Sequence, residues 1–279
     1  MQFDNPLIIQ SDRTLLLDVH APLANDCRND LIPFAELEKS PEHLHTYRLT
    51  PLSLWNATSA GFTPEDAIKV LEKYARYDVP QSVVFWIQET AGRFGKLKIV
   101  PGPKMQVPLK PTEVFSEETT YTGQMIEEQF LYLVASSKPI FLEISANKKK
   151  KKYISPCEYD ESVENACVEL TEDEKKYCFL LKLTDRGTIK QELLKILWPV
   201  KDEVQLEDGE PLDFSLKETT SDGKKLEIRN YQKEAAKAIV GNRGPGTGFG
   251  TIVLPCGAGK TVVGMTVMDM LKTSTLIII

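Results

Sequence analysis

The sequence predicts an α+β N-terminal region, made of a hairpin and a winged-helix-like group of helices, followed by the beginning of an α/β domain. Two apolar runs at residues 7–10 and 15–19 are compatible with strands, and three proline-marked helix starts follow them. An apolar run at 251–254 then leads through a glycine turn into an apolar helix start. The 279 residues, 42% of them hydrophobic, suffice for about two domains.

The N-terminal elements are predicted from turn and cap residues. Polar residues 11–14 separate the two apolar runs and favour a turn, which predicts a hairpin. Thr50 and Thr63 each precede a proline, so each can cap a helix whose first position tolerates that proline. Pro80 precedes a third helix, and residues 96–100 predict a strand. Three short helices followed by a strand are compatible with a winged-helix-like module.

The third predicted helix leaves two interpretations open. Winged-helix modules often read DNA with this helix. Here, however, Val83, Trp86 and Ile87 make it apolar where a recognition helix needs Arg, Lys or Asn. The composition favours a packed helical bundle over DNA reading by this helix.

The middle of the chain predicts a change of organisation. Four prolines between 101 and 111 indicate a linker or an irregular edge, and apolar segments follow at 130–135 and 139–144. A further helical pattern runs from Gly187 to Trp198, before a polar connector. The predicted domains are an accessory domain at 1–105, a second accessory or linker region at 106–215, and the start of an α/β domain at 216–279.

The unbroken lysine run at 148–152 is followed by an acidic stretch. A lysine run can contact phosphate, but it is more often a solvated loop tip. The sequence favours the solvated tip.

Bulk composition excludes several classes of protein. A formal charge of -6 excludes a broad positive field, so any contact with nucleic acid is local. Five cysteines without a CxxC pair suit neither a disulfide framework nor a zinc site, and His20, His43 and His45 provide no ligand set. The absence of a signal-like or membrane-spanning run predicts a soluble, cytoplasmic protein.

The strongest chemical signal is the glycine turn before the last predicted helix. Glycines allow successive amides to surround phosphate oxygens, and a helix N-terminus adds positive potential. Lys260 would neutralise the terminal phosphates of a nucleotide, and the Thr261 hydroxyl would bind Mg²⁺. The strict phosphate-loop pattern has glycine where this chain has Leu254. The predicted phosphate-binding residues are Pro255, Cys256, Gly257, Ala258, Gly259, Lys260 and Thr261.

A second signal lies on the helix predicted before this loop. The amide of Gln232 can donate to and accept from an adenine edge, and Arg229 supports the same interpretation. Two competing patterns fail on context. The glycines at 246–250 follow a helix and precede a strand, the reverse of a dinucleotide-binding turn. The acidic pair at 202–203 precedes the loop and follows no apolar strand, so we interpret it as a solvated connector.

Several segments together resemble bacterial XPB-type helicases of superfamily 2. In that superfamily the first glycine of the strict phosphate loop is dispensable, and a glutamine upstream recognises adenine. The resemblance rests on LPCGAGKT from Leu254, Tyr231 with Gln232, QSDRT from Gln10, FAELEKSP from Phe34 and LTPLSLWNA from Leu49. It is specific at residues 1–100 and 180–279 and weak at 105–175.

The resemblance implies an ATP-driven, 3′ to 5′ DNA helicase acting in DNA repair, with an accessory region before two RecA-like domains. ATP and Mg²⁺ would be its cofactors. DNA would be its partner through local contacts, together with a nuclease or another repair protein and no membrane. Because residues 276–279 would fall in the next strand of the first RecA-like domain, and no Asp-Glu box follows, we expect the chain alone not to hydrolyse ATP usefully and to be poorly ordered beyond residue 225.

Two alternatives remain open at the level of sequence. The first is a non-enzymatic DNA- or protein-binding module formed by residues 1–215, with a vestigial or truncated motor tail. The second is a different phosphate-loop class such as a kinase, against which only the spacing between Gln232 and Lys260 argues.

Overall fold

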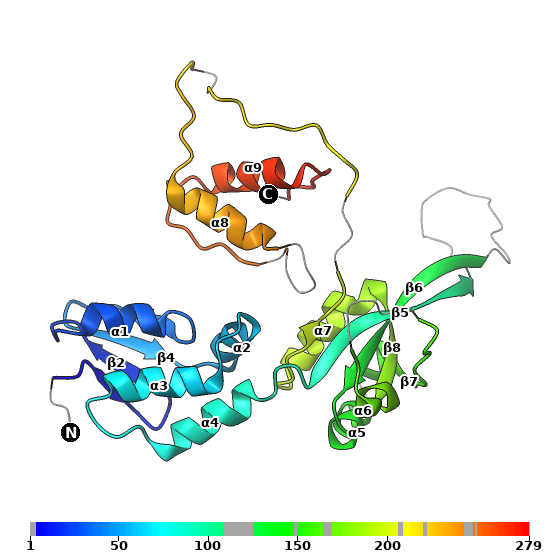
Figure 1. The fold of residues 1–279 in the computed structure, drawn as a ribbon, viewed down its shortest axis with the longest axis horizontal. Coiled ribbons are helices and arrows are strands. Elements are labelled where there is room, and N and C mark those ends of the chain that lie inside the picture. The colour runs from blue at the N-terminus through cyan, green and yellow to red at the C-terminus, as the bar shows by residue number, and fades with distance from the viewer. Residues whose placement is uncertain are drawn as a thin grey trace. The chain divides into compact units, whose positions relative to one another are not determined.

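The computed structural model describes residues 4–108, 125–147, 150–163, 169–205, 209–219, 222–242, 248 and 250–278. The chain forms two compact units, Met1–Lys201 and Asp202–Ile279 (Figure 1). The described residues contain helices and two β-sheets, so mixed α/β structure is confirmed.

The first unit begins with a four-stranded antiparallel sheet in the order β1-β2-β4-β3. Its strands are β1 (Leu7–Ile9), β2 (Thr14–Asp18), β3 (Glu36–Lys39) and β4 (Leu44–Arg48), with α1 (Ala24–Leu31) between β2 and β3. The predicted hairpin is confirmed as β1 and β2. Alternate residues of β2, Leu15 and Leu17, are fully buried in a core that they share with the helices.

Three helices follow where the caps predict them: α2 (Pro51–Ser59), α3 (Pro64–Tyr74) and α4 (Gln81–Ala91). The Oγ1 of Thr50 accepts a hydrogen bond from the Ser53 amide at 3.0 Å, and that of Thr63 accepts from the Asp66 amide at 3.1 Å. These bonds satisfy amides that a helix leaves open at its first turn.

The rest of the first unit is built on a five-stranded sheet in the order β7-β8-β6-β5-β9. The strands are β5 (Leu97–Pro108), β6 (Met125–Ala135), β7 (Ile154–Cys157), β8 (Cys178–Lys182) and β9 (Lys201–Asp202). The helices are α5 (Lys138–Ala146), α6 (Glu172–Lys176) and α7 (Arg186–Leu194), with short 3₁₀ turns η1 (Lys150–Lys152) and η2 (Leu183–Asp185). In Figure 1, β5 and β6 form one long antiparallel ribbon.

Of the two alternatives predicted for 101–111, a linker or an irregular edge, the linker is not formed over the described part, because β5 continues through the prolines to residue 108. The register with β6 shifts between Pro101 and Lys104, which accommodates residues that cannot donate to the ladder. A Cβ on Gly102 would lie 2.8 Å from the Phe130 carbonyl oxygen of β6, so the close approach of the two strands at this position requires glycine. The predicted domain boundary after residue 105 falls inside β5 and stays a prediction; residues 109–111 lie outside the described residues.

The interpretation of the lysine run as a solvated tip is wrong for Lys150, which is 2% exposed, whereas Lys151 and Lys152 are exposed. Burial lowers the pKa of Lys150, while the nearby carboxylates of Glu192 and Glu143 act in the opposite direction. Lys148 and Lys149 lie outside the described residues.

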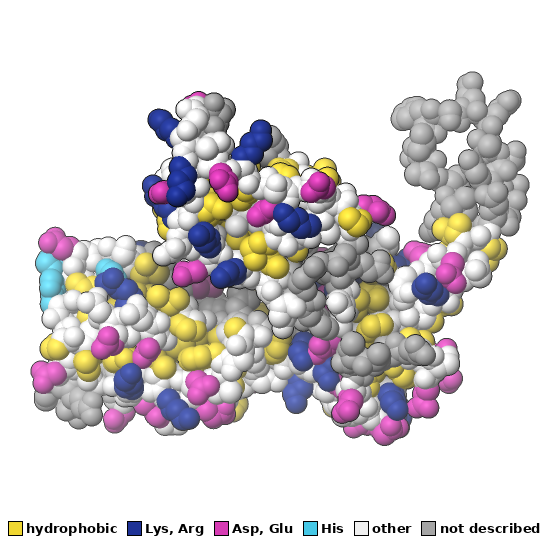
Figure 2. Space-filling view, turned by 45° about the horizontal axis from the view of Figure 1, so that its top comes forward, with side chains coloured by type: hydrophobic (Ala, Val, Ile, Leu, Met, Phe, Trp, Pro, Cys, Tyr) yellow, Lys and Arg dark blue, Asp and Glu magenta, His cyan; other side chains and the backbone are white. Residues whose placement is uncertain are grey.

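Figure 2 shows charges of both signs interspersed among the described residues on the visible face. Within the described part of the chain, no helix is long and apolar enough to cross a membrane.

The second unit contains α8 (Asn230–Val240) and α9 (Lys260–Leu271), which pack together and bury Ala236, Val240 and Val263. The prediction of a strand at 251–254 is wrong, because no strand is formed there and Val253 is 87% exposed. Residues 276–278 are likewise exposed outside any strand, and Ile279 lies outside the described residues. Among the described residues from 209 to 278, β-pairing is limited to isolated bridges. The apolar runs at 251–254 and 276–278 therefore have no neighbouring strand with which to pair.

Candidate functional site

The candidate site is the turn that leads into α9. Gly257 and Gly259 both have a φ of 78°, which side-chain-bearing residues rarely adopt. Between them the turn is closed by the Ala258 amide, which donates to the Pro255 carbonyl at 3.3 Å. The alternation of glycine with other residues therefore gives this loop its curled backbone.

Gly259 is the N-cap of α9, so the amides of Lys260, Thr261 and Val262 begin a helix in which they have no intrahelical acceptor. These amides and the helix dipole favour an anion. Both the Lys260 and Thr261 side chains are exposed, and the Lys260 ammonium donates to the Pro255 carbonyl at 3.2 Å. The cation thus lies over the same loop as the open amides.

Gln232 connects α8 to the loop. Its side chain is 5% exposed; its Oε1 accepts from the Arg229 amide at 2.9 Å, and its Nε2 donates to the Ala258 carbonyl at 2.9 Å. The Tyr231 hydroxyl donates to the same Ala258 oxygen at 2.8 Å. The structure therefore brings the predicted Gln232 to the predicted loop, and Arg229 is linked to it through Gln232.

Tyr231 is a contact that sequence reasoning did not include among the site residues. The only signal for it is an aromatic hydroxyl next to Gln232, which by itself does not show that the hydroxyl reaches a loop 27 residues later. The two bonds of the Gln232 side chain use one of the two hydrogens on Nε2 and one of the two lone pairs on Oε1. One hydrogen and one lone pair therefore remain.

Close packing between Gln232 and Gly259 explains the second glycine. A Cβ at position 259 would lie 2.6 Å from Gln232 Nε2, whereas one at Gly257 would meet no atom within 4 Å. Gly259 is needed for both its backbone angle and the space beside it, and Gly257 for its angle alone.

The other predicted loop residues differ in their exposure. Pro255, Cys256 and Gly257 are exposed, Ala258 is half-buried, and Cys256 has a free thiol. Lys260 and Thr261 also line an apolar hollow of about 570 Å³, together with Leu254, Val263 and Ile277.

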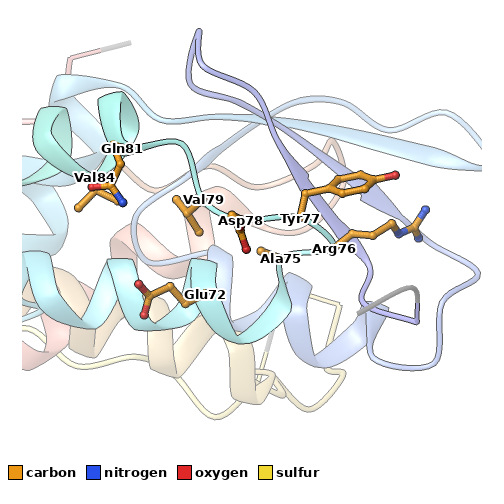
Figure 3. A pocket seen from close by; sticks show the side chains of 8 residues that line it. All are labelled: Glu72, Ala75, Arg76, Tyr77, Asp78, Val79, Gln81 and Val84. Atoms are coloured by element: carbon orange, nitrogen blue, oxygen red, sulfur yellow. The ribbon is translucent and has the colours of Figure 1, made fainter. Parts of the chain in front are cut away.

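A separate hollow of about 340 Å³ lies in the first unit, between the end of α3 and the start of α4 (Figure 3). Arg76, which lines it, is paired with Asp18 at 3.1 Å and donates to the Asn5 carbonyl. Figure 3 shows the Arg76 and Tyr77 side chains directed away from Glu72, so the polar groups do not converge. Among the described residues no group of His, Cys, Asp and Glu is arranged to hold a metal ion.

Comparison with known proteins identifies two family models along the chain. Residues 7–117 match the helicase conserved C-terminal domain, and residues 225–279 match the type III restriction enzyme, res subunit. The second match contains the whole candidate site.

Three curated relatives illustrate the similarity. The chain is 36% identical to a DNA 3′-5′ helicase XPB of Mycobacterium tuberculosis and 37% identical to one of Kineococcus radiotolerans, each over 99% of the chain and 41% of the relative. It is 27% identical, over 97% of the chain and 33% of the relative, to the general transcription and DNA repair factor IIH helicase/translocase subunit XPB/SSL2 of Saccharomyces cerevisiae. The chain spans about two fifths of the length of the bacterial relatives.

Proposed function

We propose that this chain is part of an XPB-type superfamily 2 helicase and that it supplies the accessory region and the ATP-phosphate loop of a 3′ to 5′ DNA helicase. The observation that carries the proposal is the loop at the start of α9. Positive-φ glycines, open helix amides and a lysine converge there, which is the chemistry that a triphosphate requires.

ATP and Mg²⁺ fit the donors present in this loop. The amides at 259–262 would take phosphate oxygens, and the Lys260 ammonium would leave the Pro255 carbonyl for a terminal phosphate. The exposed Thr261 hydroxyl is a hard oxygen ligand of the kind that Mg²⁺ prefers. Bound Mg²⁺ would neutralise charge on the phosphates; these residues would hold and orient them.

Gln232 and Arg229 form the adenine side of the proposed site. One edge of the Gln232 amide is used in holding the loop, and the remaining hydrogen and lone pair match the donor and acceptor of an adenine edge. Adenine recognition would thereby be joined through Ala258 to the phosphate loop.

DNA is the proposed partner, through local contacts of a chain that has a net charge of -6. The helices α2–α4 and the strand β5 follow the order of a winged-helix-like module, which supports an accessory role for this region. A repair setting, with a nuclease or another repair protein as a further partner, is part of the same proposal because the Saccharomyces cerevisiae relative is a helicase/translocase subunit of a general transcription and DNA repair factor.

The proposal is tested by titrating the full chain with a fluorescent ATP analogue in the presence of Mg²⁺. We expect saturable binding that weakens at least about tenfold in Lys260→Ala, since a charge-assisted phosphate contact contributes about 1.5–3 kcal/mol. Lys233→Ala, which removes an exposed lysine on α8, is the matched control and should bind as the unchanged chain does. Chelation of Mg²⁺ should also weaken binding.

Equal affinities of the Lys260→Ala and Lys233→Ala variants, or no saturable binding, would contradict the proposal. The alternative function would then be a non-enzymatic DNA- or protein-binding module. The separate core of the unit Met1–Lys201 is the observation that favours this alternative.

A further inference from the structure

Two cysteines face each other on neighbouring strands of the five-stranded sheet. Cys157 on β7 and Cys178 on β8 are direct cross-strand partners, and their Sγ atoms are 3.2 Å apart. Both are free thiols; Cys178 is 0% exposed and Cys157 is half-buried. Twenty-one positions separate them along the chain, so only the fold brings them together.

The backbone at this position suits a disulfide. Directly opposed residues of an antiparallel pair have Cα atoms about 4.5–5.5 Å apart, within the range of about 4.4–6.8 Å that disulfides span. Side chains of such a pair project from the same face of the sheet. The two sulfurs therefore need only a small side-chain rotation to reach bonding distance.

The surroundings of the pair are apolar. Cys178 belongs to a buried cluster with Val100, Tyr132 and Val134, against which Cys157 and Tyr159 pack. The Asp160 amide donates to the Tyr132 hydroxyl at 3.2 Å, so the chain after β7 folds back over this cluster. A disulfide at this place would add a covalent link between the edge strand β7 and its neighbour β8.

We propose that Cys157 and Cys178 form a reversible intramolecular disulfide when the protein meets a peroxide, a property separate from the proposed nucleotide site. Peroxide reaches the half-buried Cys157 first. Its sulfur takes one peroxide oxygen and becomes a sulfenic acid, with release of one water. The Cys178 sulfur then forms the S–S bond and displaces the hydroxyl, which leaves as a second water. The two thiols lose two electrons and two protons, and the peroxide is reduced to two waters.

Electrostatics favour the second of these steps and disfavour the first. The hydrogen bond between the two thiols lowers the pKa of Cys178 against the effect of burial, which favours Cys178 as the attacking sulfur. The same hydrogen bond, together with burial, raises the pKa of Cys157, so the first step is expected to be slow.

The test treats the full chain with hydrogen peroxide, alkylates the remaining thiols and maps the peptides by mass spectrometry. We expect the peptides that carry Cys157 and Cys178 to be joined, and dithiothreitol to separate them. Because the bond closes a loop of about 20 residues, the melting temperature of the first unit should rise by roughly 5–10 °C on oxidation and return on reduction.

Cys157→Ser, with Cys157→Ala as a second variant in case serine disturbs folding, should lose both the cross-link and the shift. Cys256→Ser removes an exposed thiol elsewhere and should keep both. Oxidation of Cys157 to a sulfinic acid without a cross-link, or pairing of either cysteine mainly with Cys167 or Cys256, would overturn the proposal.

Discussion

Single residues determine the shape of the candidate site, and the two positive-φ glycines are its clearest case. They share a φ of 78°, but only Gly259 is packed against another side chain. Tyr231 and Gln232 contact one carbonyl oxygen, that of Ala258. A change at Gly259 therefore reaches α8, whereas a change at Gly257 stays within the loop.

We predict that Gly257→Ala and Gly259→Ala differ in cost. Each forces alanine into the left-handed region, at about 1–2 kcal/mol. Gly259→Ala additionally displaces Gln232 and loses its hydrogen bond to Ala258, a further loss of about 1 kcal/mol. Urea unfolding of the second unit measures both, and equal losses would show that Gln232 does not hold the loop in solution.

A second residue-scale prediction concerns the buried carboxylate of Glu174, which is 4% exposed and lies 2.6 Å from the Lys98 ammonium. Burial raises the pKa of Glu174, but Lys98 and the Thr171 amide outweigh it and hold the pKa below 4.5. A carboxyl whose folded pKa is lowered stabilises the fold above its unfolded pKa and loses that contribution as the pH falls through the folded value.

The free energy of unfolding of the first unit should therefore decrease as the pH is lowered below about 4.5. Glu174→Gln should cost about 2 kcal/mol at neutral pH and flatten this dependence. Glu172→Gln, at an exposed neighbour, is the control and should leave it unchanged. Denaturant unfolding at a series of pH values would refute the prediction if Glu174→Gln kept the full slope.

At the scale of elements, caps were the most informative part of the sequence. The threonine-proline pairs predicted the starts of α2 and α3 because cap chemistry is local: one hydroxyl and an amide three residues later suffice. The strand at 251–254 was predicted from apolarity alone and is not formed. A strand depends on a neighbour, which a local pattern does not report.

We predict that removal of the two caps destabilises the first unit unequally. Thr63→Ala loses the capping box of α3, at about 1 kcal/mol. Thr50→Ala loses a comparable cap. Both hydroxyls donate to a carboxylate, but that of Thr63 bonds Asp66 within its own cap at 2.7 Å, whereas that of Thr50 bonds Glu36 on β3 at 2.6 Å, so Thr50→Ala also loses a contact between two elements and should cost more. Thermal unfolding compares the two, and a larger loss in Thr63→Ala would contradict the role of the Glu36 contact.

At the scale of the whole molecule, the sequence predicts one contact of the smaller unit better than the architecture of the larger one. Gln232 and the loop are predicted to belong to one site, and the structure joins them through the Ala258 carbonyl, while their nucleotide-binding roles stay predictions. The five-stranded sheet was missed because a proline-rich sequence is typical of a linker. The prolines of β5 are accommodated by a register shift against β6, and such a shift is visible only once the strands are paired. Lys150 was misjudged for a similar reason, since burial of one lysine in a run is decided by tertiary packing.

The Ala258 carbonyl oxygen joins the two helices of the smaller unit through hydroxyl and amide donors that precede it by 27 and 26 residues. Fluctuations that detach α8 must break these bonds, and so must fluctuations that unfold the loop. A ligand held only by the loop would consequently slow deuterium uptake in α8 as well, although it touches no backbone amide of that helix.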